Sequence, residues 1–251
     1  MSIGEILSVA LAGLAAGTIN TLVGSGTLIT FPVLLAFGYA PVTANVSNTI
    51  GLVPGSVSAA VGYRRELADQ GRHVVRLGVM SVLGGVTGAV LLLVLPASAF
   101  KAIVPVFIAI ALALIVLQPR LNRWLLKHHP EVEREGGVLT PIAVYATGVY
   151  GGYFGAAQGI LLLGILGVAL PQDLHRTNAL KNVLAGLVNG VAGVYFVLAA
   201  HVEWAPAGII AGASILGAQL GARYGRRLPP AALRAIIVVV GILAIARLLL
   251  T

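Results

Sequence analysis

Two motifs occur twice in this chain, and both pairs are separated by the same distance. SVLGGVTGA begins at Ser81 and SILGAQLGA at Ser214, while LPASAFKAIV begins at Leu95 and LPPAALRAII at Leu228. Both spacings are 133 residues (214−81 and 228−95), and five of nine and five of ten positions are identical. A repeat this long limits the architecture before any site is considered. It predicts a molecule assembled from two related halves.

The composition places both halves in a membrane. Hydrophobic residues make up 58% of the 251 residues and charged residues 10%, whereas an average soluble domain is about 25% charged. Apolar runs near the roughly 20 residues needed to cross a bilayer recur along the whole chain. They lie at 6–23, 44–62, 77–95, 102–117, 138–154, 177–199, 206–222 and 231–250, and two runs at 27–37 and 158–170 are too short to cross. We therefore expect an all-α integral membrane protein in the lipid bilayer.

The charges beside the repeats predict that the two halves are inverted. The loop 63–76 carries four arginines, but the corresponding segment 201–206 has no Lys or Arg. Basic loops stay on the cytoplasmic side, so corresponding loops are expected on opposite faces of the inner (plasma) membrane. Inversion requires an odd number of elements in each half: a long helix, a short broken or re-entrant helix and three further transmembrane helices. Both termini are then expected outside, with the longest loop cytoplasmic.

The chain is expected to form a single membrane domain of two repeats, 1–117 and 138–251, joined by a cytoplasmic linker at 118–137. In the linker, Trp124 stands among basic residues, which favours a short helix on the inner surface with its cations near lipid phosphates; a solvated connector is the alternative. The net charge of +8 lies mostly in such loops. That distribution is typical of membrane topology and argues against a nucleic-acid partner.

Glycines mark two further features of the repeats. Pairs of glycines four residues apart recur, a spacing that lets helix backbones approach closely in lipid: Gly13 and Gly17, Gly84 and Gly88, Gly151 and Gly155, Gly217 and Gly221. Other glycines break the chain between a long and a short run, in NTLVGSGTLITFP (from Asn20) and YGGYFGAAQGILLLG (from Tyr150). Gly24 and Gly155 hold corresponding places in these breaks, 131 residues apart.

A break of this kind exposes the first amides of the following short helix, and amides at a helix N-terminus form an anion site. Irregular backbone at membrane depth persists only where it is buried or lines a cavity. If the two hairpins enter from opposite faces, their tips are expected to meet near the midplane, where inverted-repeat transporters bind substrate. Tight turns at the membrane surface are the alternative.

A polar stripe follows each short run. RTNALKNVLAGLVNG places Asn178, Lys181 and Asn182 on one helix face, and ANVSNTIGLVPGS does the same with Asn45, Asn48 and Thr49. A Lys at the centre of a spanning helix costs about 3 kcal/mol on insertion scales. Lys181 therefore either extends to the membrane surface or serves as a buried charge. As a buried charge it is expected to pair with an anion, because no acidic residue lies in a predicted span.

All eight carboxylates stand at the ends of runs or in loops, so a carboxylate proton relay through the core is not expected. The chain has no cysteine, and His, Asp and Glu do not cluster within the spans. A membrane-embedded enzyme would need such a cluster. We expect neither an enzyme nor a metal or cofactor site.

At these motifs the chain resembles the sulfite exporter TauE/SafE family of membrane permeases. The signature lies in AGTINTLVGSGTLITFPVLLAFGYAPVTANVSNTIGLVPGSVSAAVGYRR, and a weaker copy lies in the second half. The resemblance implies transport of small anions, often sulfur-containing ones such as sulfite, thiosulfate or sulfonates.

The residues thus predict a secondary transporter of a small anion that works by alternating access around a midplane site. The resemblance implies that it is an exporter and that the anion is sulfite or another sulfur-containing anion. The predicted substrate-binding residues come from the two breaks and the two stripes: Asn20, Gly24, Ser25, Gly26, Thr27, Asn45, Asn48, Thr49, Gly155, Ala156, Ala157, Gln158, Asn178, Lys181 and Asn182. A passive anion channel and a structural membrane subunit are the alternatives. The sequence leaves open whether the chain forms a homo-oligomer.

Overall fold

The structure, a computed structural model, describes residues 1–127, 137–170 and 172–224 and, farther along the chain, 235, 237–239, 242–243 and 245. Through residue 224 the described backbone forms helices and no strand, which confirms the predicted all-α class. The helices are α1 (Ile3–Leu22), α2 (Thr27–Ala36), α3 (Pro41–Gly62), α4 (Gly71–Val94), α5 (Ala97–Lys127), α6 (Leu139–Tyr153), α7 (Gln158–Ala169), α8 (Leu174–Ala199) and α9 (Trp204–Tyr224).

Five of these helices are long and apolar enough to cross a membrane: α1, α4, α5 over Ala97–Leu117, α8 and α9. The helices α2 and α7 have 10 and 12 residues, well short of the roughly 20 that a crossing needs. The helix α5 continues to Lys127, so the predicted linker begins inside a helix. Residues 128–136 of that linker and most of the predicted span 231–250 lie outside the described residues.

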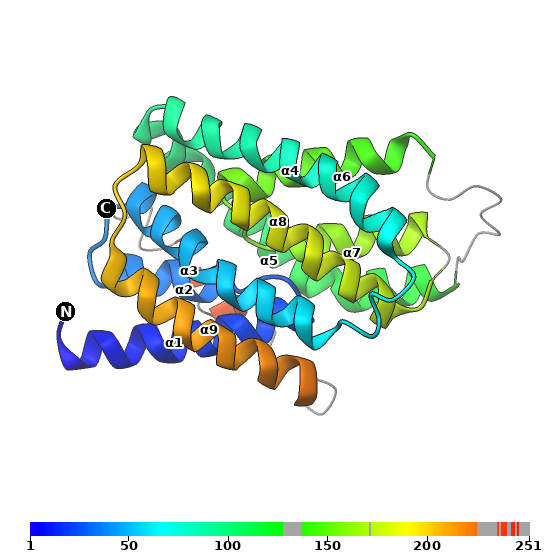
Figure 1. Cartoon of the computed structure of the whole chain (residues 1–251). Coiled ribbons are helices and arrows are strands. Elements are labelled where there is room, and N and C mark those ends of the chain that lie inside the picture. Colours follow the sequence, from blue (N-terminus) through cyan, green and yellow to red (C-terminus); the bar gives the residue numbers. More distant parts are fainter. Residues whose placement is uncertain are drawn as a thin grey trace.

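The helices α1, α3 and α9 run in the same direction and pack together (Figure 1). The residue numbers of the contacting positions increase together, as they do in parallel helices: Gly13 and Gly51 lie against Ile210, and Gly17 and Gly55 lie against Ser214. A Cβ atom on Gly17 would lie 2.3 Å from the Ser214 carbonyl oxygen, so the two backbones touch. The glycine spacing predicted this close packing. We call these three helices the α1 unit.

The helices α4, α6 and α8 form a second group, the α6 unit, which runs in the opposite direction (Figure 1). The residue numbers of its contacting positions also increase together. Gly84 lies against Gly148 and Gly88 against Tyr153, while Gly78 contacts Leu187 and Gly85 contacts Val191. Each unit takes helices from both halves of the sequence, because α4 of the first half packs with α6 and α9 of the second half packs with α1. The repeat therefore builds two similar units that exchange one helix.

The two units meet where α3 crosses α8. These helices are antiparallel, because Ser56 lies against Gly186 while the earlier residue Ile50 lies against the later residue Gly193. Links 37–40, 95–96 and 200–203 lie at the end of the molecule where α1 begins, which we call the N-terminal face. Residues 63–70, 170 and 172–173 lie at the other end, which we call the Arg64 face.

The helices α1 and α6 each form a hairpin with the short helix that follows, α2 or α7, and the two turns are built in the same way. The amides of Val23 and Gly24 both donate to the carbonyl of Ile19, and the amides of Phe154 and Gly155 both donate to that of Tyr150. The two glycines have φ of +84° and +74°, the left-handed conformation that ends many helices and favours glycine. The glycine breaks of the sequence are therefore helix ends, at the tips of α1–α2 and α6–α7.

The two tips touch. The amide of Gly159, in the first turn of α7, donates to the carbonyl of Gly24 over 3.1 Å. A Cβ on Gly24 would lie 2.3 Å from the Gly159 Cα, which leaves no room for any side chain on either residue. The sequence predicted that the two tips meet if the hairpins enter from opposite faces. The structure shows that the tips do meet.

We expect Gly159→Ala to destabilise the protein because its methyl group would force the tips apart. Overpacking of this kind costs about 1–3 kcal/mol, more than the up to 1 kcal/mol that alanine gains over glycine in a helix. The matched control is Gly190→Ala in α8, where an added Cβ meets no atom within 4 Å. Thermal unfolding of the purified proteins in detergent should show a lower Tm for Gly159→Ala only. Equal Tm values would show that the tips are not rigidly packed.

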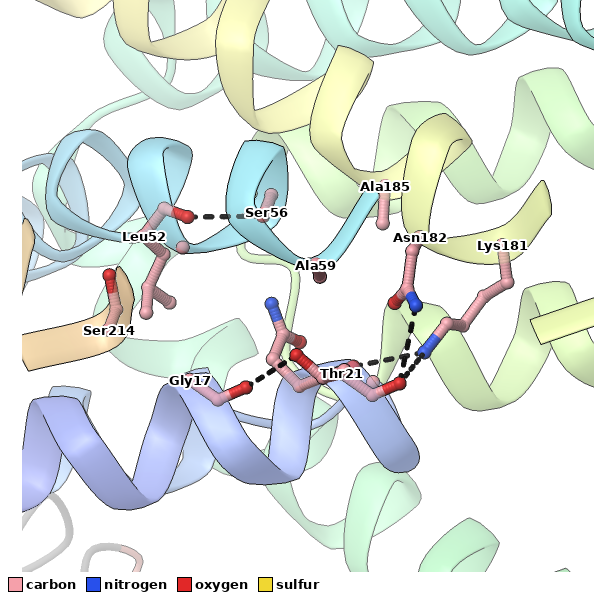
Figure 2. A pocket seen from close by; sticks show the side chains of 12 residues that line it. Gly17, Thr21, Leu52, Ser56, Ala59, Lys181, Asn182, Ala185 and Ser214 are labelled. Carbon is pink, nitrogen blue, oxygen red and sulfur yellow. Dashed lines mark hydrogen bonds between the residues drawn. The ribbon is translucent and has the colours of Figure 1, made fainter. Parts of the chain in front are cut away.

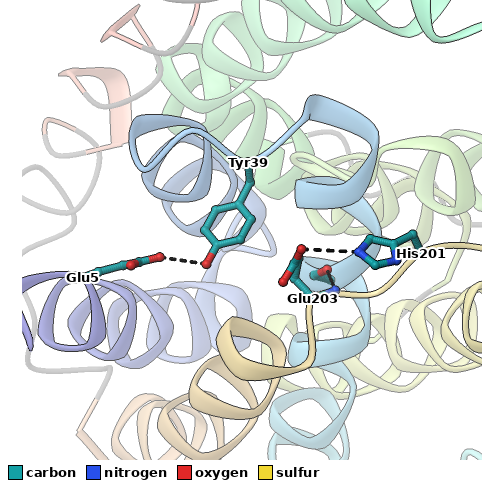
Figure 3. A network of polar contacts seen from close by, with 5 residues as sticks. Glu5, Tyr39, His201 and Glu203 are labelled. Atoms are coloured by element: carbon teal, nitrogen blue, oxygen red, sulfur yellow. Dashed lines mark hydrogen bonds and ion pairs between the residues drawn. The ribbon is translucent and has the colours of Figure 1, made fainter. Parts of the chain in front are cut away.

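A polar network joins the α1 unit at the N-terminal face (Figure 3). The Tyr39 hydroxyl, in the link before α3, donates to Glu5 of α1 over 2.7 Å. Burial is the larger cause and this hydrogen bond the next cause that raise the pKa of Tyr39 to about 12. Glu203, just before α9, lies 3.4 Å from His201, and its amide donates to Ser47 of α3 over 2.9 Å. These contacts fix the starts of all three helices at one level.

Candidate functional site

Lys181 is a fully buried residue of α8, so the interpretation that it extends to the membrane surface is wrong. Its ammonium group donates to the carbonyls of Asn20 and Thr21 over 2.9 and 3.3 Å. Among the residues that the structure describes, no carboxylate forms an ion pair with it. An ammonium carries three donors, so one remains without a partner among the described residues.

The partners of Lys181 are the last carbonyls of α1, which the break at Gly24 leaves without amides of a following turn (Figure 2). The side-chain amides of Asn178 and Asn182 also donate to the Thr21 carbonyl, over 3.0 and 3.3 Å. The C-terminus of a helix carries about half a negative charge, which attracts a cation. The polar stripe of α8 therefore caps α1 inside the protein, and the helix end offsets part of the lysine charge.

A pocket lies beside this cap, between the last turns of α1 and the middle of α3, α8 and α9 (Figure 2). It is lined by Gly17, Asn20, Thr21, Gly24, Leu52, Gly55, Ser56, Ala59, Lys181, Asn182, Ala185 and Ser214. The volume open to a water-sized molecule is about 10 Å³, which is room for about one water. The pocket is thus narrow in this conformation, and we call it the Lys181 pocket.

Four of the predicted substrate-binding residues line this pocket: Asn20, Gly24, Lys181 and Asn182. The rest of the first tip lies just behind it. The amide of Gly26 faces the Asn20 side chain at 3.5 Å, the hydroxyl of Ser25 is buried, and no hydrogen-bond partner for it lies among the described residues. Thr27 accepts a hydrogen bond from Asn48 over 3.4 Å.

The second tip is packed differently and does not line the pocket. Ala156 and Ala157 are fully buried in an aromatic cluster with Phe31, Phe100 and Phe154, whose rings meet edge to face. The Gln158 side chain fills the space beside Gly151, where an added Cβ would lie 2.4 Å from it. Gly155 itself ends α6. The predicted convergence of amides from both tips on one pocket is therefore not what this conformation shows.

The polar stripe of α3, in the first half, also caps the end of a helix, as the polar stripe of α8 does in the second half. Asn45 donates to the carbonyl of Tyr153, the last residue of α6, over 3.0 Å. Asn178 does the same for α1 and stands 133 residues later (178−45). Asn48 holds the place that corresponds to Lys181 (181−48 is 133), but it bonds to α2 instead. The charge is thus present in one of two related sites, as the asymmetry of the sequence indicated.

The small residues of the pocket were missed as site residues. Ser56 ends the motif ANVSNTIGLVPGS, and Ser214 begins the repeated motif SILGAQLGA. Neither signal indicated how closely α3 approaches α9 here: a Cβ on Gly55, next to Ser56, would lie 2.6 Å from the Ser214 hydroxyl. Close packing of α3 on α9 creates this wall.

Comparison with known proteins agrees with this architecture of a multi-pass membrane protein. The profile of the family "Sulfite exporter TauE/SafE" matches residues 9–248, and the chain belongs to this family. It is 31% identical over 240 residues to the "Probable membrane transporter protein ORF9" of Sinorhizobium sp, covering 95% of this chain and 90% of that protein. It is 27% identical to the "Probable membrane transporter protein YfcA" of Escherichia coli K12, covering 93% and 86%. A "Probable membrane transporter protein" of Haemophilus influenzae is 28% identical, covering 84% and 81%.

Proposed function

We propose that this protein is a secondary transporter that exports a small anion, such as sulfite or another sulfur oxyanion, by alternating access through the Lys181 pocket. The observation that carries the proposal is a fully buried ammonium group beside a pocket, with no carboxylate partner among the described residues. The family profile, "Sulfite exporter TauE/SafE", supports this substrate class.

The electrostatics of the pocket favour an anion. Burying a charge is costly unless it is paired, and the end of α1 supplies only about half a compensating charge. A bound anion would complete the neutralisation and accept the free donor of Lys181. The amides of Asn20 and Asn182 lie in the same pocket and can donate to further oxygens. Because the pocket holds about one water, binding requires it to widen.

The movement that widens the pocket is a rocking of the two units at the place where they meet. Corresponding helices run in opposite directions, since α1, α3 and α9 share one direction and their counterparts α6, α8 and α4 share the other. This supports inverted repeats, the arrangement in which two halves rock around a fixed site. At one end of the α3–α8 crossing, Gly193 packs on Ile50 and Val53, and at the other end a groove of about 400 Å³ remains open. Rocking would close one end and open the other.

The same proposal orients the protein in the inner (plasma) membrane. Among the described residues, arginines gather at the Arg64 face: Arg64, Arg65, Arg72, Arg76, Arg176 and Arg223. Lys101 is the described basic residue nearest the N-terminal face. The positive-inside rule places the Arg64 face in the cytoplasm and the N-terminus outside. The predicted external C-terminus lies outside the described residues.

The test is flux in proteoliposomes that contain the purified protein. We expect saturable uptake of radiolabelled sulfite, thiosulfate or methanesulfonate, and faster uptake when the same anion is loaded inside, since exchange of this kind is a property of carriers. Phosphate and acetate complete the panel. Uptake that rises linearly with concentration would favour a passive channel, and absence of flux for every anion would favour a structural subunit.

A further inference from the structure

A groove between α3 and α8 opens on the Arg64 side of their crossing. Its volume is about 400 Å³, and it is lined by Ser56, Val57, Ala60, Val61, Arg64, Asn182, Val183, Gly186 and Leu187. Ser56 and Asn182 line both this groove and the Lys181 pocket. The two spaces are therefore neighbours, and these two polar side chains belong to the wall of each.

The position of the groove follows from the way the helices cross. A Cβ on Gly186 would lie 3.3 Å from the Ser56 Cβ, so α3 and α8 touch at this level. Beyond it, α3 continues through Val57 and Val61 to Arg64, and these residues form one wall of the groove. The contact between Ser56 and Gly186 thus marks the inner end, and Arg64 marks the outer end.

Arg64 is the charged residue among those that line the groove. It is exposed, and among the described residues its guanidinium donates one hydrogen bond, to the Val61 carbonyl at 3.4 Å. No ion pair involves it in the described part of the chain. Because a guanidinium has five donors, most of its donors have no partner in the described part of the chain. The groove therefore leads from one cation at its mouth to a second, Lys181, behind its inner end.

We propose that this groove is the water-filled access path of the anion, with Arg64 attracting the anion at the mouth and with Ser56 and Asn182 forming the constriction before Lys181. The inference rests on the proposed function and assigns its route. A small oxyanion is the occupant that the charges favour, since its oxygens can accept hydrogen bonds from Arg64, Ser56 and Asn182. A lipid acyl chain has no acceptor and would contact only the apolar part of the lining. The path opens at the Arg64 face in this conformation.

Cysteine labelling tests the path without a background, because the chain contains no cysteine. Ser56→Cys is the probe, Arg65→Cys is the exposed control, and Leu216→Cys on the apolar surface of α9, 62% exposed, is the lipid-facing control. Membrane-impermeant methanethiosulfonates are added from one side of oriented vesicles. We expect Ser56→Cys and Arg65→Cys to react from the same side and Leu216→Cys to stay unmodified. A Ser56→Cys protein as unreactive as Leu216→Cys would overturn the path.

The sign of the reagent tests the role of Arg64. The quantity measured is the ratio of the rate at which Ser56→Cys reacts with the anionic reagent MTSES to its rate with the cationic reagent MTSET. We expect Arg64→Gln to lower this ratio by about three- to tenfold. The matched control is Arg65→Gln, which should leave the ratio unchanged. Methanesulfonate, which does not consume thiol reagents, should slow the labelling. An unchanged ratio in Arg64→Gln would overturn the attraction by Arg64.

The outcomes separate the path from the function. Anion flux in proteoliposomes together with an unreactive Ser56→Cys would overturn the path and leave the proposed transporter standing. Reactive Ser56→Cys without flux, and without protection by methanesulfonate, would overturn the proposed function and with it the path. Labelling that also blocks flux, with protection by methanesulfonate, is the result that we expect.

Discussion

Replacing Lys181 with methionine is expected to lower anion uptake by about 10- to 100-fold at low substrate concentration. Methionine keeps most of the length of the side chain but removes the charge and the donors that hold the anion. A hydrogen bond to a charged group contributes about 1.5–3 kcal/mol, which corresponds to this range of rates. The measurement is initial uptake of radiolabelled sulfite or methanesulfonate into proteoliposomes, normalised to the amount of inserted protein.

Capping of α1 and binding of the anion must be separated in this experiment, because Lys181 contributes to both. The matched control is Asn178→Ala, which removes a hydrogen bond to the Thr21 carbonyl but leaves the charge in place. We expect it to lower the Tm and to reduce uptake far less than Lys181→Met. If Lys181→Met lowers the Tm and transports at the normal rate, the lysine serves only as a helix cap.

A disulfide between Ile50→Cys and Gly193→Cys is expected to abolish transport. A Cβ on Gly193 would lie 3.9 Å from the Ile50 Cα and 3.7 Å from its Cγ1. The Ile50 Cβ is bonded to both of these atoms, and disulfides join residues whose Cβ atoms are about 3.5–4.5 Å apart. The bond would hold the closed end of the α3–α8 crossing together and so stop the two units from rocking. We expect uptake to fall by at least about tenfold on oxidation, as for any gate held in one of two states, and to return with dithiothreitol.

The controls use the same chemistry at other places. Each single variant should transport before and after oxidation. The pair Gly13→Cys and Ala213→Cys joins α1 to α9 inside one unit, where a Cβ on Gly13 lies 3.0 Å from the Ala213 Cβ and has to shift slightly. This pair should keep transport when oxidised. Full activity of the oxidised Ile50–Gly193 pair would contradict rocking at α3–α8.

Much of the fold could be predicted because lipid restricts the choices. Apolar runs, glycine breaks and the 133-residue spacing predicted where helices lie and which parts of the two halves correspond. Local signals were sufficient for the hairpin tips, since Gly24 and Gly155 occupy a backbone conformation that few other residues adopt. The exchange of α4 and α9 between the halves was not predicted, because it depends on contacts between glycines far apart in the sequence.

The candidate site was harder to predict because its two halves have diverged in packing. Asn20, Gly24, Lys181 and Asn182 were identified from breaks and stripes, and they line the pocket. The second tip was expected there as well, but Gln158 and the rings around Phe154 fill that region. The small residues Ser56 and Ser214 complete the pocket through helix packing, which leaves no signal in a single sequence.

The central claim is that an anion binds beside Lys181, and anomalous diffraction tests it most directly. Crystals of the protein with ordinary methionine, soaked in selenite as the selenium analogue of sulfite, would carry selenium only in the bound anion. The account predicts one ordered selenium peak within about 4 Å of the Lys181 Nζ atom, the range of a close ion pair, and its loss in Lys181→Met. Selenium that binds elsewhere, or that stays beside residue 181 after this substitution, would contradict it.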